Sequence, residues 1–167
     1  MKYTSAEVGK LLKKLNDEHE SILLREMNGK EFLAAVGESL SSVRPDYDFG
    51  ATQAALDEIE AKIRKVKHAL NVFNSTTVIP EFNVTIDEML VLIPQLTAKK
   101  SKLARMKDKL PKVREQSRTN LAILDYRYLN YDVNEATAEY EKVADTLAKA
   151  QNALDAVNMT KTLEITL

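Results

Sequence analysis

The sequence predicts a mainly α fold: a long antiparallel helical hairpin or bundle with coiled-coil-like heptad seams and a small antiparallel β element. Three observations predict it. Apolar residues recur at alternating spacings of three and four, only four Gly and four Pro occur in 167 residues, and charged residues make up 29%. Scarce turn-forming residues favour long helices, and helices with one apolar stripe become stable by packing against each other.

The segment predicted as a helix at residues 50–74 has the clearest seam. Its apolar residues are spaced three and four apart without interruption: Leu56, Ile59, Ile63, Val66, Leu70 and Phe73. Charged residues fill the positions between them, so the helix has one apolar side to bury. Asp48 precedes it and is the predicted N-cap.

Two more helices are predicted at residues 5–28 and 86–115, each opened by a capping box in which a Thr and a Glu three residues later satisfy backbone N–H groups. The boxes are Thr4 with Glu7 and Thr85 with Glu88. The seam of the helix predicted at 86–115 continues through Leu110 to Val113. Pro111 interrupts it and is expected to kink or end the helix.

A fourth helix is predicted at residues 133–157, capped by Asp132. Residues 121–130 and 162–167 are rich in β-forming side chains and are predicted strands that pair with each other. Residues 31–36 are predicted either to join them as a third strand or to belong to a short helix. All of these elements are assigned to a single helical domain, residues 1–167.

Composition and motifs argue against several classes of function. Without Cys there are no disulfides, thiolate zinc sites or thiol nucleophiles. The two His residues stand far apart, and no phosphate-binding, dinucleotide-binding or nucleophile-elbow motif occurs. We therefore predict no enzymatic activity, no catalytic residues, no cofactor and no metal site. The start of the chain has no signal-peptide pattern, and no apolar run is long enough to span a bilayer. We expect a cytoplasmic protein without a membrane partner.

The segments that end at 76 and 160 share a pattern of Ala-Leu, Asn or Asp, an apolar residue, Asn and Thr. Its polar members are Asn74, Thr76, Asn158 and Thr160. We interpret them as structural helix-exit caps, with each Asn in the left-handed position after its helix. The functional alternative is a polar pocket that brings the amides and hydroxyls together.

Residues 99–118 form a basic segment opposed by only two acidic residues. Its members are Lys99, Lys100, Lys102, Arg105, Lys107, Lys109, Lys112, Arg114 and Arg118. Residues 132–157 instead hold six acidic residues and two lysines. Electrostatic matching of neighbouring helices is the simpler interpretation. The alternative is a face for nucleic acid, with Tyr126, Tyr128 and Tyr131 available to stack on bases.

The helix-end patterns, together with residues 63–77 and the Asp-Tyr-Arg-Tyr run at 125–128, resemble an uncharacterised bacterial family sometimes labelled septicolysin-like. Those proteins have a helix ending in an Ile-Asn-x-Thr-Asn-type exit and a closing Leu-Asp-x-x-Ile-Gln-x-x-Asn-Trp-Thr-type end. The closing pattern here is 154–160, with Met159 where the family usually has Trp. The resemblance spans most of the chain and implies an α-helical bacterial protein of unassigned role.

Two functions remain open at this point. The first is a non-enzymatic interaction or assembly protein, expected to be a homo-oligomer because its seams exceed what two helices need. Its protein partner is not specified by the sequence. The second is a nucleic-acid-binding protein that uses the basic segment.

Overall fold

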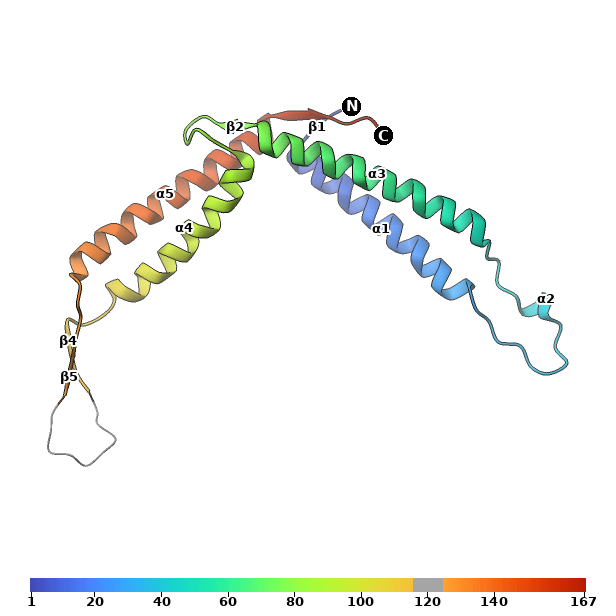
Figure 1. The fold of residues 1–167 in the computed structure, drawn as a ribbon, viewed down its shortest axis with the longest axis horizontal. Coiled ribbons are helices and arrows are strands. Elements are labelled where there is room, and N and C mark those ends of the chain that lie inside the picture. The colour runs from blue at the N-terminus through green and yellow to red at the C-terminus, as the bar shows by residue number, and fades with distance from the viewer. Residues whose placement is uncertain (116–124) are drawn as a thin grey trace. The chain divides into compact units, whose positions relative to one another are not determined.

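The computed structural model describes residues 1–115 and 125–167. Within them, long helices dominate and three short antiparallel strand pairs complete the fold, which confirms the predicted mainly α class (Figure 1). The chain forms two compact units. Unit 1 comprises Met1–Thr76 and Val157–Leu167, and unit 2 comprises Thr77–Ala156.

Unit 1 is built on two antiparallel helices, α1 (Ser5–Gly29) and α3 (Phe49–Thr76), which lie side by side (Figure 1). The predicted seams form their interface. Val8 and Val66 are completely shielded from solvent. The other buried residues of the two helices are Leu15, Ile22, Leu56, Ile59 and Phe73. The seam spacing therefore predicted the core of this unit.

The predicted caps of both helices are confirmed. At the start of α1, the Glu7 N–H donates to Thr4 Oγ1 at 3.3 Å, and the Thr4 N–H donates to Glu7 Oε2 at 2.8 Å. At the start of α3, Asp48 Oδ1 accepts a hydrogen bond from the Ala51 N–H at 2.9 Å. These bonds satisfy N–H groups that have no partner within the helix.

A short sheet brings the two ends of the described chain together. Strand β1 (Lys2–Thr4) pairs with β6 (Thr162–Glu164). The predicted pairing of 162–167 with 121–130 is therefore wrong. Thr4 both ends β1 and caps α1, so the strand leads directly into its helix, and Leu163, opposite Tyr3 in the sheet, is buried.

The connection between α1 and α3 contains one short helix, α2 (Leu40–Val43), and residues 31–36 form no strand. Both alternatives predicted for this stretch, a third strand and a short helix at 31–40, are therefore wrong. Leu33 and Val36 lie almost fully exposed, so burial of these apolar side chains does not stabilise a strand there.

A hydrogen-bond cluster ties this connection to both helices. Glu26 Oε1 accepts from the Tyr47 hydroxyl at 3.0 Å and from Gln53 Nε2 at 2.8 Å. Gly29, the last residue of α1, allows the close approach, because a Cβ there would lie 2.9 Å from Tyr47 Cβ. Burial and the carboxylate of Glu26 raise the pKa of Tyr47.

Unit 2 begins with a tight hairpin of β2 (Val78–Ile79) and β3 (Val84–Thr85). Its turn places Asn83 at a φ of 51°, a left-handed conformation that Asn tolerates better than most residues. The hairpin leads into α4 (Ile86–Lys107), whose predicted Thr85–Glu88 capping box is confirmed.

Helix α4 ends at Lys107, so the predicted extent of 86–115 is wrong. The chain continues into β4 (Lys112–Arg114), which pairs with β5 (Tyr126–Tyr128). Pro111 lacks an N–H and disfavours helical geometry at the residue before it. Leu110 and Val113 were predicted in the seam but are 68% and 44% exposed. Residues 121–124 of the predicted strand lie outside the described residues.

The last helix, α5 (Val133–Thr160), runs beside α4 in unit 2 as far as Ala156, and its last four residues belong to unit 1 (Figure 1). Its predicted cap is confirmed, because Asp132 Oδ1 accepts from the Asn134 N–H at 2.7 Å. The buried residues of α5 include the predicted seam members Ala136, Val143, Leu147, Ala150, Leu154 and Val157. Long side chains of α4 reach α5 at Lys99 and Lys100, whereas the backbones of α1 and α3 approach closely.

Candidate nucleic-acid interface

The predicted basic segment lies in unit 2, along the second half of α4 and on β4. Helix α4 carries Lys99, Lys100, Lys102, Arg105 and Lys107, and the residues after it carry Lys109, Lys112 and Arg114. Arg118 lies outside the described residues. Because α4 ends at Lys107, residues 112–114 can form β4 and pair with β5. A helix that continued to residue 115 would not allow this pairing.

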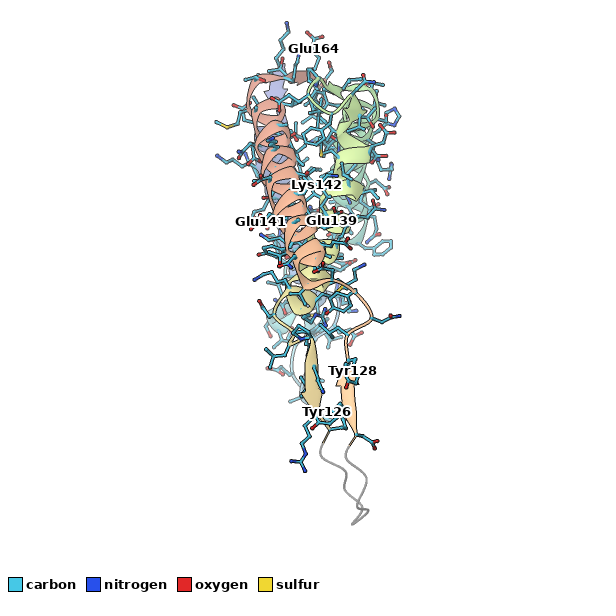
Figure 2. All side chains as sticks on the ribbon, turned by 90° about the vertical axis from the view of Figure 1, so that its left-hand side faces the viewer. Tyr126, Tyr128, Glu139, Glu141, Lys142 and Glu164 are labelled. Carbon is cyan, nitrogen blue, oxygen red and sulfur yellow. The ribbon has the colours of Figure 1, made fainter. Side chains whose placement is uncertain are left out.

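Part of this segment is neutralised inside unit 2. Lys99 Nζ contacts Glu139 Oε1 on α5, and this hydrogen bond lowers the pKa of Glu139. In Figure 2, Glu139 and Glu141 lie on opposite sides of α5. Lys107 pairs with Asp108 at 2.9 Å, which raises the pKa of the lysine. Electrostatic matching of α4 to α5 is therefore real at Lys99.

Tyr140 on α5 contributes a second kind of contact. Lys107 Nζ lies 5.2 Å from the centroid of its ring, and Lys100 Nζ lies 6.0 Å from it. An aromatic face attracts a cation without cancelling its charge. Lys100 thus keeps its positive charge at the surface of α4.

Besides Lys100, five cations of the segment have no carboxylate within ion-pair distance in the part of the chain that the structure describes. We call these residues the cationic end: Lys102, Arg105, Lys109, Lys112 and Arg114. Arg105 Nε donates to the backbone oxygen of Ser101, at 3.3 Å. Helix pairing therefore leaves most of the basic segment available to an outside anion.

Three members of the cationic end line an open depression of about 500 Å³ in unit 2. Its lining residues are Lys102, Arg105, Lys109, Arg127, Met106, Leu129 and Tyr131. The Tyr131 hydroxyl donates to the Met106 carbonyl oxygen at 2.9 Å and so fixes the floor to the end of α4. The result is a shallow apolar floor with basic side chains around it.

Strands β4 and β5 form a two-stranded ribbon next to this depression. Its register places Lys112 opposite Tyr128 and Arg114 opposite Tyr126, so these four side chains share one face. Figure 2 labels both tyrosines on the ribbon. Tyr126 and Tyr128 are 43% and 63% exposed.

The cation and the rings on this face are in contact. Lys112 Nζ lies 4.1 Å from the ring centroid of Tyr126 and 5.3 Å from that of Tyr128. The two ring centroids are 6.4 Å apart and the ring planes are inclined by 49°. The tyrosines are therefore not stacked on each other.

The other face of the ribbon is organised by an ion pair. Arg127 donates to both carboxylate oxygens of Glu115, from Nε at 3.0 Å and from Nη2 at 2.8 Å. This pairing raises the pKa of Arg127. Sequence reasoning did not single out Arg127, although its place between two tyrosines of a predicted strand puts it on the opposite face.

The cationic end and the exposed tyrosine rings have the chemistry to attract anions and aromatic rings. Within residues 1–115 and 125–167, no three His, Asp or Glu side chains gather in a way that could hold a metal ion. No helix in those ranges is long and apolar enough to cross a membrane.

The predicted helix-exit residues lie in unit 1 and have a different arrangement from the one expected. Asn74 lies inside α3 and Asn158 inside α5, because each helix continues two residues further. The left-handed cap position predicted for them is therefore wrong. The Oδ1 atoms of both are buried without a hydrogen-bond partner. Thr76 Oγ1 donates to the Val72 carbonyl oxygen at 2.7 Å, and Thr160 ends α5.

The fold and this surface define a class of protein: one built on antiparallel helical hairpins, with the cationic end on α4 and on the β4–β5 ribbon. The structure is similar to that of a functionally unknown conserved protein from Corynebacterium diphtheriae, with a TM-score of 0.61 and 15% identity over 98% of this chain and 100% of that one. At that identity the likeness concerns the fold alone. No family model matches the chain, and no curated protein matches it.

Proposed function

We propose that the protein is a non-enzymatic interaction protein whose unit 2 binds nucleic acid through the cationic end. The observation that carries the proposal is the absence of carboxylate partners for those five side chains among the described residues. Helix α5 offers acidic residues nearby, yet only Lys99 of α4 forms an ion pair with it in the described part of unit 2. Cations left unpaired beside an acidic helix are suited to phosphates.

The spread of the charges favours a polymer over a small anion. The cationic end begins on α4 and continues through the depression onto β4. A single phosphate would contact only part of it, whereas the backbone of a nucleic acid presents one charge per nucleotide along its length. The open depression also lacks the enclosure of a metabolite site.

The test is the affinity for a fluorescently labelled oligonucleotide, measured by anisotropy at low salt. The triple variant Lys102→Glu, Arg105→Glu, Lys109→Glu should bind at least about tenfold more weakly, because each cation neutralises one phosphate. The matched control changes three exposed lysines of α1 in unit 1: Lys10→Glu, Lys13→Glu and Lys14→Glu. The two variants have the same net charge. Equal losses in both would point to net charge alone and contradict the proposal.

Self-assembly is the second candidate function, and unit 1 supplies the observation that favours it. Bulky apolar side chains lie exposed around the connection between α1 and α3: Leu24, Met27, Leu33, Leu40 and Phe49 are between 54% and 96% exposed. Exposed apolar groups in such number are typical of interaction surfaces. In this hypothesis a second copy of the chain covers them, because two hairpins can pair into a four-helix arrangement.

Light scattering coupled to size exclusion tests the second candidate. A homo-oligomer that dissociates when Leu33 and Phe49 are changed to Glu supports it. A monomer at all accessible protein concentrations contradicts it. Neither result alters the prediction for the cationic end, since the two surfaces belong to different units.

A further inference from the structure

We propose that the β4–β5 ribbon selects single-stranded over double-stranded nucleic acid by stacking bases on Tyr126 and Tyr128. The inference rests on the proposed function and specifies its ligand. It is carried by the face that the strand register creates, with two tyrosines of one strand opposite two cations of the other.

Exposure and orientation leave the rings available. Tyr126 and Tyr128 are 43% and 63% exposed, and no described residue accepts a hydrogen bond from either hydroxyl. Tyrosines that serve only to pack a core are normally buried with the hydroxyl paired. The rings are inclined by 49° and so leave aromatic surface that neither ring covers for the other.

The spacing of the rings fits an extended strand. Their centroids are 6.4 Å apart, whereas successive bases of one strand in a duplex are about 3.4 Å apart. Two neighbouring bases can therefore rest on the two rings only after they have separated from each other. A single strand reaches that state readily, and a duplex reaches it only by losing its base stacking.

Lys112 supplies the charge that such a nucleotide requires. Its ammonium lies over both rings and has no carboxylate partner among the described residues. An incoming base takes the place of the ammonium on the ring, and the flexible side chain then reaches the phosphate of the same nucleotide. Arg114, on the same face, is placed to meet the next phosphate.

The strand can then continue from the ribbon to the helix. The Leu129 N–H donates to the Pro111 carbonyl oxygen at 3.1 Å, which joins the base of the ribbon to the depression that Leu129 helps to line. Lys102, Arg105 and Lys109 surround that depression. Stacking on the ribbon and phosphate contacts at the depression thus belong to one path within unit 2.

The test compares two double variants of the full chain. Tyr126→Leu, Tyr128→Leu removes the aromatic faces and keeps apolar bulk, whereas Tyr126→Phe, Tyr128→Phe keeps the faces and removes the hydroxyls. The probes are a 12-nucleotide single strand, the matching duplex and an abasic 12-mer with the same phosphates. Circular dichroism checks that both variants remain folded, as expected for exposed ribbon residues.

We expect the wild type to bind the single strand at least about tenfold more tightly than either the matching duplex or the abasic strand, and equal affinity for the duplex would overturn the selectivity. The Leu variant should lose that difference, and the Phe variant should keep it within about threefold. If the Leu variant keeps it, while the Lys102, Arg105, Lys109 triple variant has lost binding, stacking is overturned and the proposed function survives. If the wild type binds none of the three probes, the proposed function itself fails. Tighter binding to vesicles of anionic phospholipid than to the single strand would make the partner a membrane surface and overturn the inference.

Discussion

Lys99 of α4 contacts Glu139 of α5 through its ammonium group, and Lys109, ten residues further along the chain, has no carboxylate partner among the described residues. The two lysines belong to the same basic segment but differ in what they contact. This difference separates the structural role of the segment from its proposed binding role.

Exchanging each of these lysines for Gln should therefore affect different properties of the protein. Lys99→Gln should lower the thermal midpoint slightly and let the pKa of Glu139 return upward toward its ordinary value, because the hydrogen bond from Lys99 lowers it. Lys109→Gln should leave the midpoint unchanged and weaken oligonucleotide binding. Calorimetry, an NMR titration of Glu139 and anisotropy measure the three quantities. The same effects from both variants would contradict the assignment.

The capping boxes predict how stability depends on pH. Hydrogen bonds from the backbone N–H groups of Thr4 and Thr85 lower the pKa values of Glu7 and Glu88 below the ordinary value of 4.5. The unfolded chain thus binds more protons than the folded one in this range, and stability rises with pH. The contribution is fully present above about pH 5 and is lost as the pH falls through the lowered pKa values.

Urea unfolding between pH 3 and pH 7 measures this dependence. Glu88→Gln should flatten the acid limb of the profile, and Thr85→Ala should cost about 1 kcal/mol at pH 7. An unchanged profile for Glu88→Gln would show that its carboxylate does not act as a cap.

Met89 and Leu90 are neighbours on α4 with opposite surroundings. Met89 is fully buried, whereas Leu90 is 47% exposed. Met89→Ala should cost about 2–5 kcal/mol of unfolding free energy because it leaves a cavity. Leu90→Ala should change it by less than about 0.5 kcal/mol in a monomer. A larger, concentration-dependent cost for Leu90→Ala would instead reveal that self-association covers this side of α4.

Replacing Asn74 and Asn158 tests the cap interpretation, which predicts a loss of stability. The structure predicts no loss or a small gain. Their buried Oδ1 atoms accept no hydrogen bond, so replacement loses no such bond. Ala is a better helix former than Asn by up to about 0.7 kcal/mol. The double variant Asn74→Ala, Asn158→Ala should therefore unfold at the same or higher urea concentration. A clear loss of stability would indicate an interaction of these amides that the polar-pocket hypothesis could explain.

The sequence predicted the helical core well, because apolar residues spaced three and four apart fall on one side of a helix and are buried together. Seam residues such as Val66 and Val143 are buried where the spacing of three and four placed them. The helix starts at Thr4, Asp48 and Thr85 were also predictable, since capping depends on neighbours in the chain.

The strand pairs were not predictable in the same way. Pairing of Tyr3 with Leu163 depends on how distant segments meet, and three residues carry too little alternation to reveal it. The heptad spacing of Leu110 and Val113 was misleading, because Pro111 outweighs apolar periodicity. The position of Arg127 opposite Val113 could be assigned only once the pairing of β4 with β5 was known. The septicolysin-like resemblance, the homo-oligomer and the cytoplasmic location stay predictions.

The salt dependence of oligonucleotide binding tests the central claim most directly. The logarithm of the wild-type association constant should fall linearly with the logarithm of salt concentration. The Lys102, Arg105, Lys109 triple variant should have a slope shallower by about 2, because each phosphate that a cation neutralises on a single strand adds roughly 0.7 to the slope. No detectable wild-type binding at low salt, or the same slope and affinity in both proteins, would contradict nucleic-acid binding at the cationic end.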